Sequence, residues 1–220
     1  LLNIEGNIKN NNNLNIENLL ISEKNNKIKI INLYLNNLNQ IIKVDQANFE
    51  YIDVENKKNI FSIKNITDSK YKIEGTKFNA NTLISNLLKN KKEIKIFEKN
   101  FNLDLDFNEV FIDQIYLVKD LKGNLKIKDN KVFEADLFGY FDDSKNINFT
   151  ISTNEYGEKI TNLFSSKAKP LVNRYKFVKG FEDGKEGYLN FSSSKINGIS
   201  NSKLVIDNFK VKEIPALAKL

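Results

Sequence analysis

Four residue types are missing from this chain of 220 residues: it contains no His, no Cys, no Met and no Trp. Without Cys there is no disulfide framework, and without His or Cys there is no imidazole base, thiol nucleophile or thiolate zinc site. Carboxylates, lysines, hydroxyls and a single arginine, Arg174, are the groups left for chemistry. The composition therefore predicts a protein that is not an enzyme and that uses no cofactor and no metal ion.

Long hydrophobic runs are also absent, since no stretch of 18 apolar residues occurs, and we expect no membrane-spanning helix. The formal net charge is +6, but Arg174 is the only arginine among 34 basic residues. Proteins that read phosphates use the bidentate fork of Arg, whereas anionic lipid headgroups require only point charges such as Lys. The basic character therefore favours a lipid surface over a nucleic-acid partner, and we expect no nucleic acid.

Strict alternation of apolar and polar residues dominates the chain. It is clearest in Lys27–Ile30, Asn102–Phe107, Leu125–Lys128 and Asn148–Ser152. Short polar turns, among them Ser194–Asn197, separate such segments every 10–15 residues. A period of two is typical of antiparallel strands with one dry and one wet face. The pattern predicts a mainly β fold: a long, antiparallel, strongly curved sheet with two or three short helices.

Helical spacing appears in three short segments. The first covers 79–89, with Asn79 or Asn81 as its N-cap, and the second runs from about Lys167 to Val178. A third helix would begin at Pro215. The side chains expected to face inward are Leu83, Ile84, Leu87, Leu88, Leu171, Val172 and Tyr175.

Groups that resemble catalytic or metal-binding motifs have simpler interpretations. Asp104 and Asp106 belong to the wet face of an alternating strand, and Asp142–Asp143 lies in a predicted turn. The run Ser192–Ser194 has no His to serve as its base, so we do not interpret it as a nucleophile motif. Lysines that alternate with apolar residues, such as Lys27 and Lys29, could line a nucleic-acid stripe, but the outer face of a half-buried sheet is the preferred interpretation.

A sheet with one apolar face has to bury that face, and a few short helices would cover only part of it. The rest either packs against itself or holds something apolar that is not protein, and the alternation fits both. The residues that would line an apolar trough are Ile28, Ile30, Leu103, Leu105, Phe107, Leu125, Ile127, Phe149, Ile151, Leu204 and Ile206.

Four ordered segments of the chain resemble the AsmA-like family of envelope proteins. Residues 71–84 are similar to its strand–Gly–helix element, and Leu117–Gly123 to its L-x-x-L-x-G strand. The stretch 175–191, with Gly180, Gly184 and Gly187, is similar to its helix followed by a glycine-rich strand entry. Residues 205–218 resemble the C-terminal element of the YhdP branch, in which a strand runs through Pro into an apolar helix.

This resemblance implies an open β-groove of the YhdP or TamB type, also called a β-taco, in a protein anchored in the inner membrane. It implies that phospholipid acyl chains pass along the groove between the inner and outer membranes, which flanking regions would reach. The chain would then be periplasmic, in a bacterium of the Gram-negative type. Catalytic residues are not known for the family, so none is transferred to this chain.

We therefore expect residues 1–220 to form one continuous segment of a longer β-groove, with possible sub-repeats at 1–90 and 91–220. Its expected function is lipid binding and transport in envelope biogenesis. The alternative from another class is a structural β-domain, a scaffold or spacer with a self-packed core and no ligand. An enzyme would require carboxylates that converge in a pocket.

Overall fold

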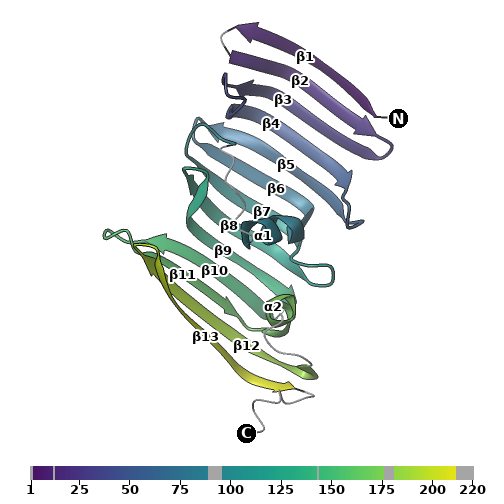
Figure 1. The fold of residues 1–220 in the computed structure, drawn as a ribbon. Helices are drawn as coiled ribbons and strands as arrows, with labels where there is room; N and C mark the ends of the chain where they lie inside the picture. Colours follow the sequence, from purple (N-terminus) through teal and green to yellow (C-terminus); the bar gives the residue numbers. More distant parts are fainter. Residues whose placement is uncertain (1, 12, 89–95, 143, 176–180, 212–220) are drawn as a thin grey trace. The chain divides into compact units, whose positions relative to one another are not determined.

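The structure is a computed structural model, and it describes residues 2–11, 13–88, 96–142, 144–175 and 181–211. The described chain is mainly β: thirteen strands follow one another in sequence order in one sheet that is not closed (Figure 1). Two short helices accompany them. The strands are β1 (Asn3–Asn11), β2 (Asn13–Glu23), β3 (Asn26–Leu35), β4 (Ile41–Ile52), β5 (Lys58–Thr67), β6 (Lys70–Asn79), β7 (Phe101–Phe111), β8 (Leu117–Lys128), β9 (Lys131–Asp142), β10 (Lys145–Thr153), β11 (Lys159–Ser165), β12 (Phe181–Ile196) and β13 (Ile199–Val211), and the helices are α1 (Asn81–Leu88) and α2 (Lys169–Tyr175).

Strands β1 to β6, the pair β7 and β8, and strands β10 to β13 pair antiparallel, as the alternation predicts. The prediction of a wholly antiparallel sheet is wrong at one place, because β6 and β7 are parallel, with Lys70 opposite Asn102. Parallel neighbours need a crossover connection, and the segment between β6 and β7, which contains α1, provides it. The period of two is the same in both kinds of strand, so it carries no information on direction.

The chain divides into two compact units, Leu1–Ala135 (unit 1) and Asp136–Leu220 (unit 2). The division lies inside β9, whereas the sequence suggested sub-repeats that meet at residue 90. Each unit is described by itself below.

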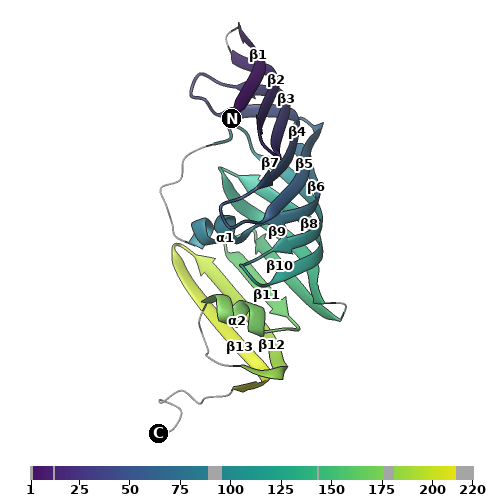
Figure 2. The ribbon, with the colours of Figure 1, turned by 90° about the vertical axis from the view of Figure 1, so that its right-hand side faces the viewer.

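Helix α1 confirms the first predicted helix and lies against one face of the unit 1 strands (Figure 2). The side-chain oxygen of Asn79 accepts the backbone N–H of Asn81 at 3.1 Å, which caps the start of the helix. Ala80 and Ile84, four residues apart, pack on the sheet, so Leu83 points away and is 51% exposed. The expected inward orientation of Leu83 is therefore wrong, and the side chains of Leu87 and Leu88 lie outside the described residues.

Helix α2 confirms the second predicted helix, with Pro170 in its first turn. Leu171 and Val172 are buried, as expected, and α2 contacts β12. The side chain of Tyr175, which was expected to face inward, lies outside the described residues. So do residues 176–180, where this helix was expected to end, and the third helix from Pro215.

Aromatic rings form the core of unit 1 where α1 covers the sheet. The ring of Phe61 stacks on Phe49 at 4.6 Å between centroids and meets the edge of Phe78 at 5.3 Å. Phe78 stacks on Phe107 at 5.5 Å, and Phe107 is buried with Val110 and Ala80. The core thus consists of one sheet face and one short helix.

Candidate functional site

Two rows of apolar residues cross unit 1 on one face of the sheet, because residues directly opposite each other on neighbouring strands point to the same side. We call them the aromatic row and the aliphatic row. The aromatic row is Ile4, Ile21, Ile28, Phe49, Phe61, Gly75, Phe107 and Leu121. The aliphatic row is Gly6, Leu19, Ile30, Ala47, Ile63, Ile73, Leu105 and Gly123.

Unit 2 has its own apolar face on strands β10 to β13. The row closest to α2, here the helix-side row, is Ile147, Ser165, Leu189 and Ile206. The next, here the middle row, is Phe149, Leu163, Phe191 and Leu204. The exposed fraction of the side chains is larger in the row farther from α2. Leu189 in the helix-side row is 2% exposed, whereas Leu204 in the middle row is 39% exposed.

The structure places the trough residues predicted from the sequence on these faces. Ile28, Ile30, Leu105 and Phe107 belong to the two rows of unit 1, and Leu103, Leu125 and Ile127 continue the same face on β7 and β8. In unit 2, Phe149 and Leu204 lie in the middle row, Ile206 lies in the helix-side row, and Ile151 follows Phe149 on the same side.

Sequence reasoning missed several members of these rows. Leu19, Phe49, Phe61, Ile63, Ile73, Leu163 and Phe191 were not predicted. Short alternating stretches such as Asn48-Phe49-Glu50-Tyr51 were the only sign of them in the sequence, and the cross-strand register was needed to assign these residues to the face.

Much of the unit 1 face has no second layer over it in the described chain. Among the residues of β1, β2 and β3 whose side chains are described, none is buried, and along the described side chains Ala47 in β4 is the first that is buried. Ile4, at the outer end of the aromatic row, is 60% exposed. The buried residues gather instead around α1 and Phe101, so the aromatic and aliphatic rows run from a covered region to an open one.

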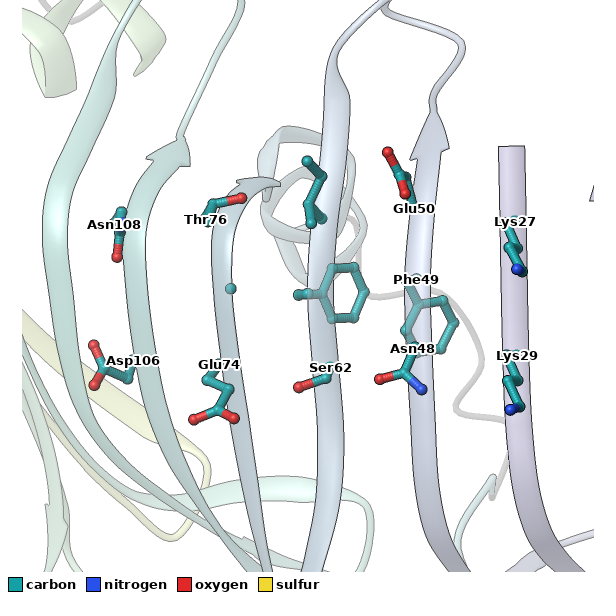
Figure 3. Close-up of a pocket in the computed structure, with 13 residues that line it drawn as sticks. Lys27, Lys29, Asn48, Phe49, Glu50, Ser62, Glu74, Thr76, Asp106 and Asn108 are labelled. Atoms are coloured by element: carbon teal, nitrogen blue, oxygen red, sulfur yellow. The ribbon is translucent and has the colours of Figure 1, made fainter. Parts of the chain in front are cut away.

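The opposite face of unit 1 is polar, and several of its charges are paired. Figure 3 shows Lys29, Asn48, Ser62, Glu74 and Asp106 projecting from successive strands, where they line a depression of about 700 Å³. Carboxylates and lysines alternate across the strands, as in the pairs Lys70–Asp104 at 2.7 Å and Lys77–Glu109 at 3.0 Å. The interpretation of Asp104 and Asp106 as the wet face of a strand is confirmed, since both carboxylates form ion pairs with surface lysines, Lys70 and Lys122.

Glu74 has the largest electrostatic shift on this face. Its carboxylate lies 2.7 Å from the Lys72 ammonium and 3.0 Å from that of Lys64, and hydrogen bonds to these two groups lower its pKa from 4.5 to about 2. A lowered carboxyl pKa stabilises the fold above pH 4.5, and that stabilisation is lost as the pH falls toward 2.

We expect an NMR titration to show the Glu74 carboxyl protonating near pH 2, and the double variant Lys64→Gln/Lys72→Gln to return it toward 4.5. Adding salt should raise the wild-type pKa of Glu74, because its side chain is 35% exposed and salt screens its ion pairs. The control Lys29→Gln, in the same polar row, should leave it near 2. A wild-type pKa near 4.5 would contradict the two ion pairs.

The groups that might suggest catalysis are structural where they are described. Ser192–Ser194 lies within β12, and Asp142 accepts hydrogen bonds from Ser144 and Lys167. Over the described ranges, no three His, Cys, Asp or Glu residues come together in a way that could hold a metal ion. Asp143 lies outside those ranges.

Comparisons with known proteins found no family model, no curated protein and no solved structure that matches this chain. No helix in the described part of the chain is long and apolar enough to cross a membrane.

Proposed function

We propose that the chain is a lipid-binding module whose apolar sheet face shields acyl chains from water. The observation that carries the proposal is the pair of apolar rows in unit 1 that continue onto β1, β2 and β3, where the described side chains include none that is buried. Monomeric proteins rarely leave a large contiguous apolar surface without a ligand or partner. Each CH₂ group kept from water stabilises a bound chain by about 0.8 kcal/mol.

Transport follows from binding if the ligand can shift from strand to strand along the rows. Together with the resemblance to AsmA-like proteins, the rows support a groove that carries phospholipid acyl chains between the inner and outer membranes. The protein would then act in the periplasm as part of an inner-membrane-anchored chain. The rows require no catalytic residue and no cofactor for this role.

The aromatic core supports the alternative function, a scaffold without a ligand. Phe49, Phe61, Phe78 and Phe107 fill part of the face with their own contacts, and α1 covers them. In that case the open rows of β1 to β3 would pack against protein rather than lipid.

The first test is organic extraction of the purified, detergent-free protein, followed by mass spectrometry of the extract. We expect near-stoichiometric lipid. A folded, soluble protein that yields no lipid would favour the scaffold.

We expect Leu105→Asp to abolish lipid loading, because it places a carboxylate in the aliphatic row, and Asp104→Leu to leave loading intact, because that side chain lies on the opposite face. Since Leu105 packs on the core cluster, Ile28→Asp in the open part of the aromatic row is the second variant, with Lys29→Asp as its matched control. Circular dichroism checks that each variant folds. Equal lipid occupancy in the two members of a matched pair would contradict the assignment of the faces.

A further inference from the structure

Exposed apolar side chains gather at one end of the unit 1 strands. Strands β4, β6 and β7 run in the same direction, so the turn after β4, the turn after β7 and the start of α1 lie at one end of the sheet, here called the α1 end. Val54 in the first of these turns is 99% exposed, and Ile115 in the second is 79% exposed. Ile52 at the end of β4 and Leu83 on α1 are exposed as well. Side chains as exposed as the two turn tips gain little from packing, so folding does not explain why they are apolar.

Hydrogen bonds join the parts of the α1 end to one another. The side chain of Asn81, at the start of α1, donates to the Glu55 carboxylate in the turn after β4 at 2.9 Å. The Lys57 ammonium, in the same turn, donates to the backbone oxygen of Gln114 in the turn after β7 at 3.1 Å. Apolar residues scattered singly over a surface are common, whereas a group of them marks a site of interaction with a protein or a membrane. The linked turns therefore form one candidate contact surface.

Both turns hold their tips in fixed positions. In the turn after β4, the Asp53 side chain accepts the backbone N–H groups of Glu55 and Lys57, both at 2.9 Å. In the turn after β7, the Asp113 side chain accepts the backbone N–H of Ile115 at 2.7 Å. Side-chain oxygens that bond the backbone two residues further on stabilise turns. The tips are thus held before any contact is made, so a partner has to order little additional chain.

The charged groups of the turn after β4 are bonded inside the protein. The side chain of Asn79 donates to the Asp53 carboxylate at 2.7 Å and to the Glu55 carboxylate at 2.9 Å. The Lys57 ammonium lies 4.5 Å from the centre of the Phe111 ring. Charges that already have partners in the protein lose less when water is removed from around them. This turn can therefore approach an apolar phase although its sequence is rich in charge.

A lipid bilayer fits the α1 end better than a protein does. A stable protein interface covers about 800 Å² on each partner, whereas separate turn tips offer apolar groups at points that fluid lipid can surround. The opposite end of unit 1 is more polar at its described turns. The turn after β3 has an apolar tip there, the exposed Leu38, but residues 68–69 and 129–130 form the turns Asp-Ser and Asp-Asn. The α1 end is therefore the end that favours a membrane, and Leu38 serves as its control.

We propose that unit 1 binds a lipid bilayer through its α1 end, with Val54 and Ile115 inserted among the lipid headgroups so that their side chains reach the acyl layer. The inference rests on the proposed function, lipid binding by the apolar rows, and adds to it the surface through which the protein meets a membrane. Because the inserted groups are apolar, a bilayer of phosphatidylcholine, which carries no net charge, is sufficient for binding.

Tryptophan fluorescence tests the insertion, because the chain contains no Trp and a single substitution gives one reporter. Val54→Trp, Ile115→Trp and Leu38→Trp each replace an exposed side chain of the whole chain. Each protein is mixed with phosphatidylcholine vesicles that contain brominated lipid. We expect the emission from positions 54 and 115 to shift to shorter wavelengths and to be quenched by the bromine. The emission from position 38 should stay as it is in buffer.

Cosedimentation with phosphatidylcholine vesicles measures the contribution of the native side chains. Val54→Asp and Ile115→Asp should each lower the partition coefficient by about tenfold, because an apolar side chain is no longer buried in lipid. The matched control Leu38→Asp should leave the partition coefficient unchanged. All three side chains are exposed, so each variant should fold like the wild type, which circular dichroism checks.

Docking through the α1 end is overturned if the wild type does not bind vesicles, or if position 38 is quenched as strongly as positions 54 and 115. It is also overturned if the emission at 54 and 115 shifts without vesicles as the protein concentration rises, because a second copy of the chain then covers these side chains. Organic extraction tests the proposed function separately: the Asp variants keep the apolar rows and should yield as much lipid as the wild type. A wild type that binds vesicles but yields no lipid on extraction would overturn the proposed function and leave the docking surface in place.

Discussion

Replacing Gly75 with alanine is expected to lower the free energy of unfolding by about 3 kcal/mol, the size of a severe overpacking error in a close-packed core. A Cβ atom on Gly75 would lie 2.5 Å from the backbone oxygen of Ile60, 2.6 Å from the Cβ of Phe61 and 2.9 Å from the ring of Phe107. Two of these atoms belong to the backbone or to the root of a side chain, so they cannot move aside without shifting β5. Urea unfolding of the whole chain measures the effect.

The neighbouring substitution Thr76→Ala is the control, because Thr76 is exposed and its loss should change the free energy of unfolding by less than about 0.5 kcal/mol. Gly157→Ala is a second control, which measures the effect of backbone strain on the free energy of unfolding where there is no crowding. No atom lies within 4 Å of the Cβ position there, but its φ of 76° costs a residue with a Cβ about 1–2 kcal/mol. A Gly75→Ala protein as stable as the wild type would show that the aromatic row is loosely packed.

Replacing Asn79 with alanine is expected to cost about 2–3 kcal/mol, because it removes a buried side chain that donates to two carboxylates and caps the N–H of Asn81. The Asn79 side-chain N–H donates to Asp53 at 2.7 Å and to Glu55 at 2.9 Å, and its backbone N–H donates to the Asn59 side-chain oxygen at 2.8 Å. Burial raises the pKa of Asp53, but hydrogen bonds from the Lys57 backbone and from Asn79 and Asn59 outweigh it, so the net pKa is lowered. This network ties the turn after β4 to the start of α1.

Hydrogen exchange reports the local effect of Asn79→Ala. The amide of Ile84, which donates to the Ala80 oxygen at 2.9 Å, should exchange faster as the start of α1 loosens. Asn48→Ala, on the polar face, is the matched control and should leave that amide unchanged. Unaltered stability and exchange in Asn79→Ala would mean that packing of Ala80 and Ile84 alone holds the helix.

Alternation in the sequence predicted which residues of a strand share a face. It did not predict the positions at which an irregularity in the strand shifts this alternation by one residue. In β7, Leu103, Leu105 and Phe107 follow the period of two, yet Val110, three residues after Phe107, joins the same core cluster. In the neighbouring β8, Asp120 adopts a left-handed φ of 49°, which interrupts the pleat between Lys119 and Leu121. The same irregularity occurs at Asn32 in β3, with a φ of 51°. A strict period of two therefore misses core residues beyond such a point.

The end of β12 was also missed. The serine run and the Asn that follows predicted a turn at Ser194–Asn197, but the strand continues to Ile196 and the turn is formed by Asn197 and Gly198. Gly198 has a φ of 82°, a conformation that glycine adopts without strain. As a result, Lys195 lies in the sheet opposite Lys159, which no pattern in the sequence indicated.

The sequence by itself determined the class of the fold, because the alternation of apolar and polar residues is a local property that each strand carries alone. It also determined both described helices and the apolar side of each predicted strand. The tertiary structure alone decided which residues share a row, that β6 and β7 are parallel, and which parts of the face α1 and α2 cover. Those features depend on register and on contacts between residues far apart in the chain, and a one-residue slip of register would move every side chain of a strand to the other face.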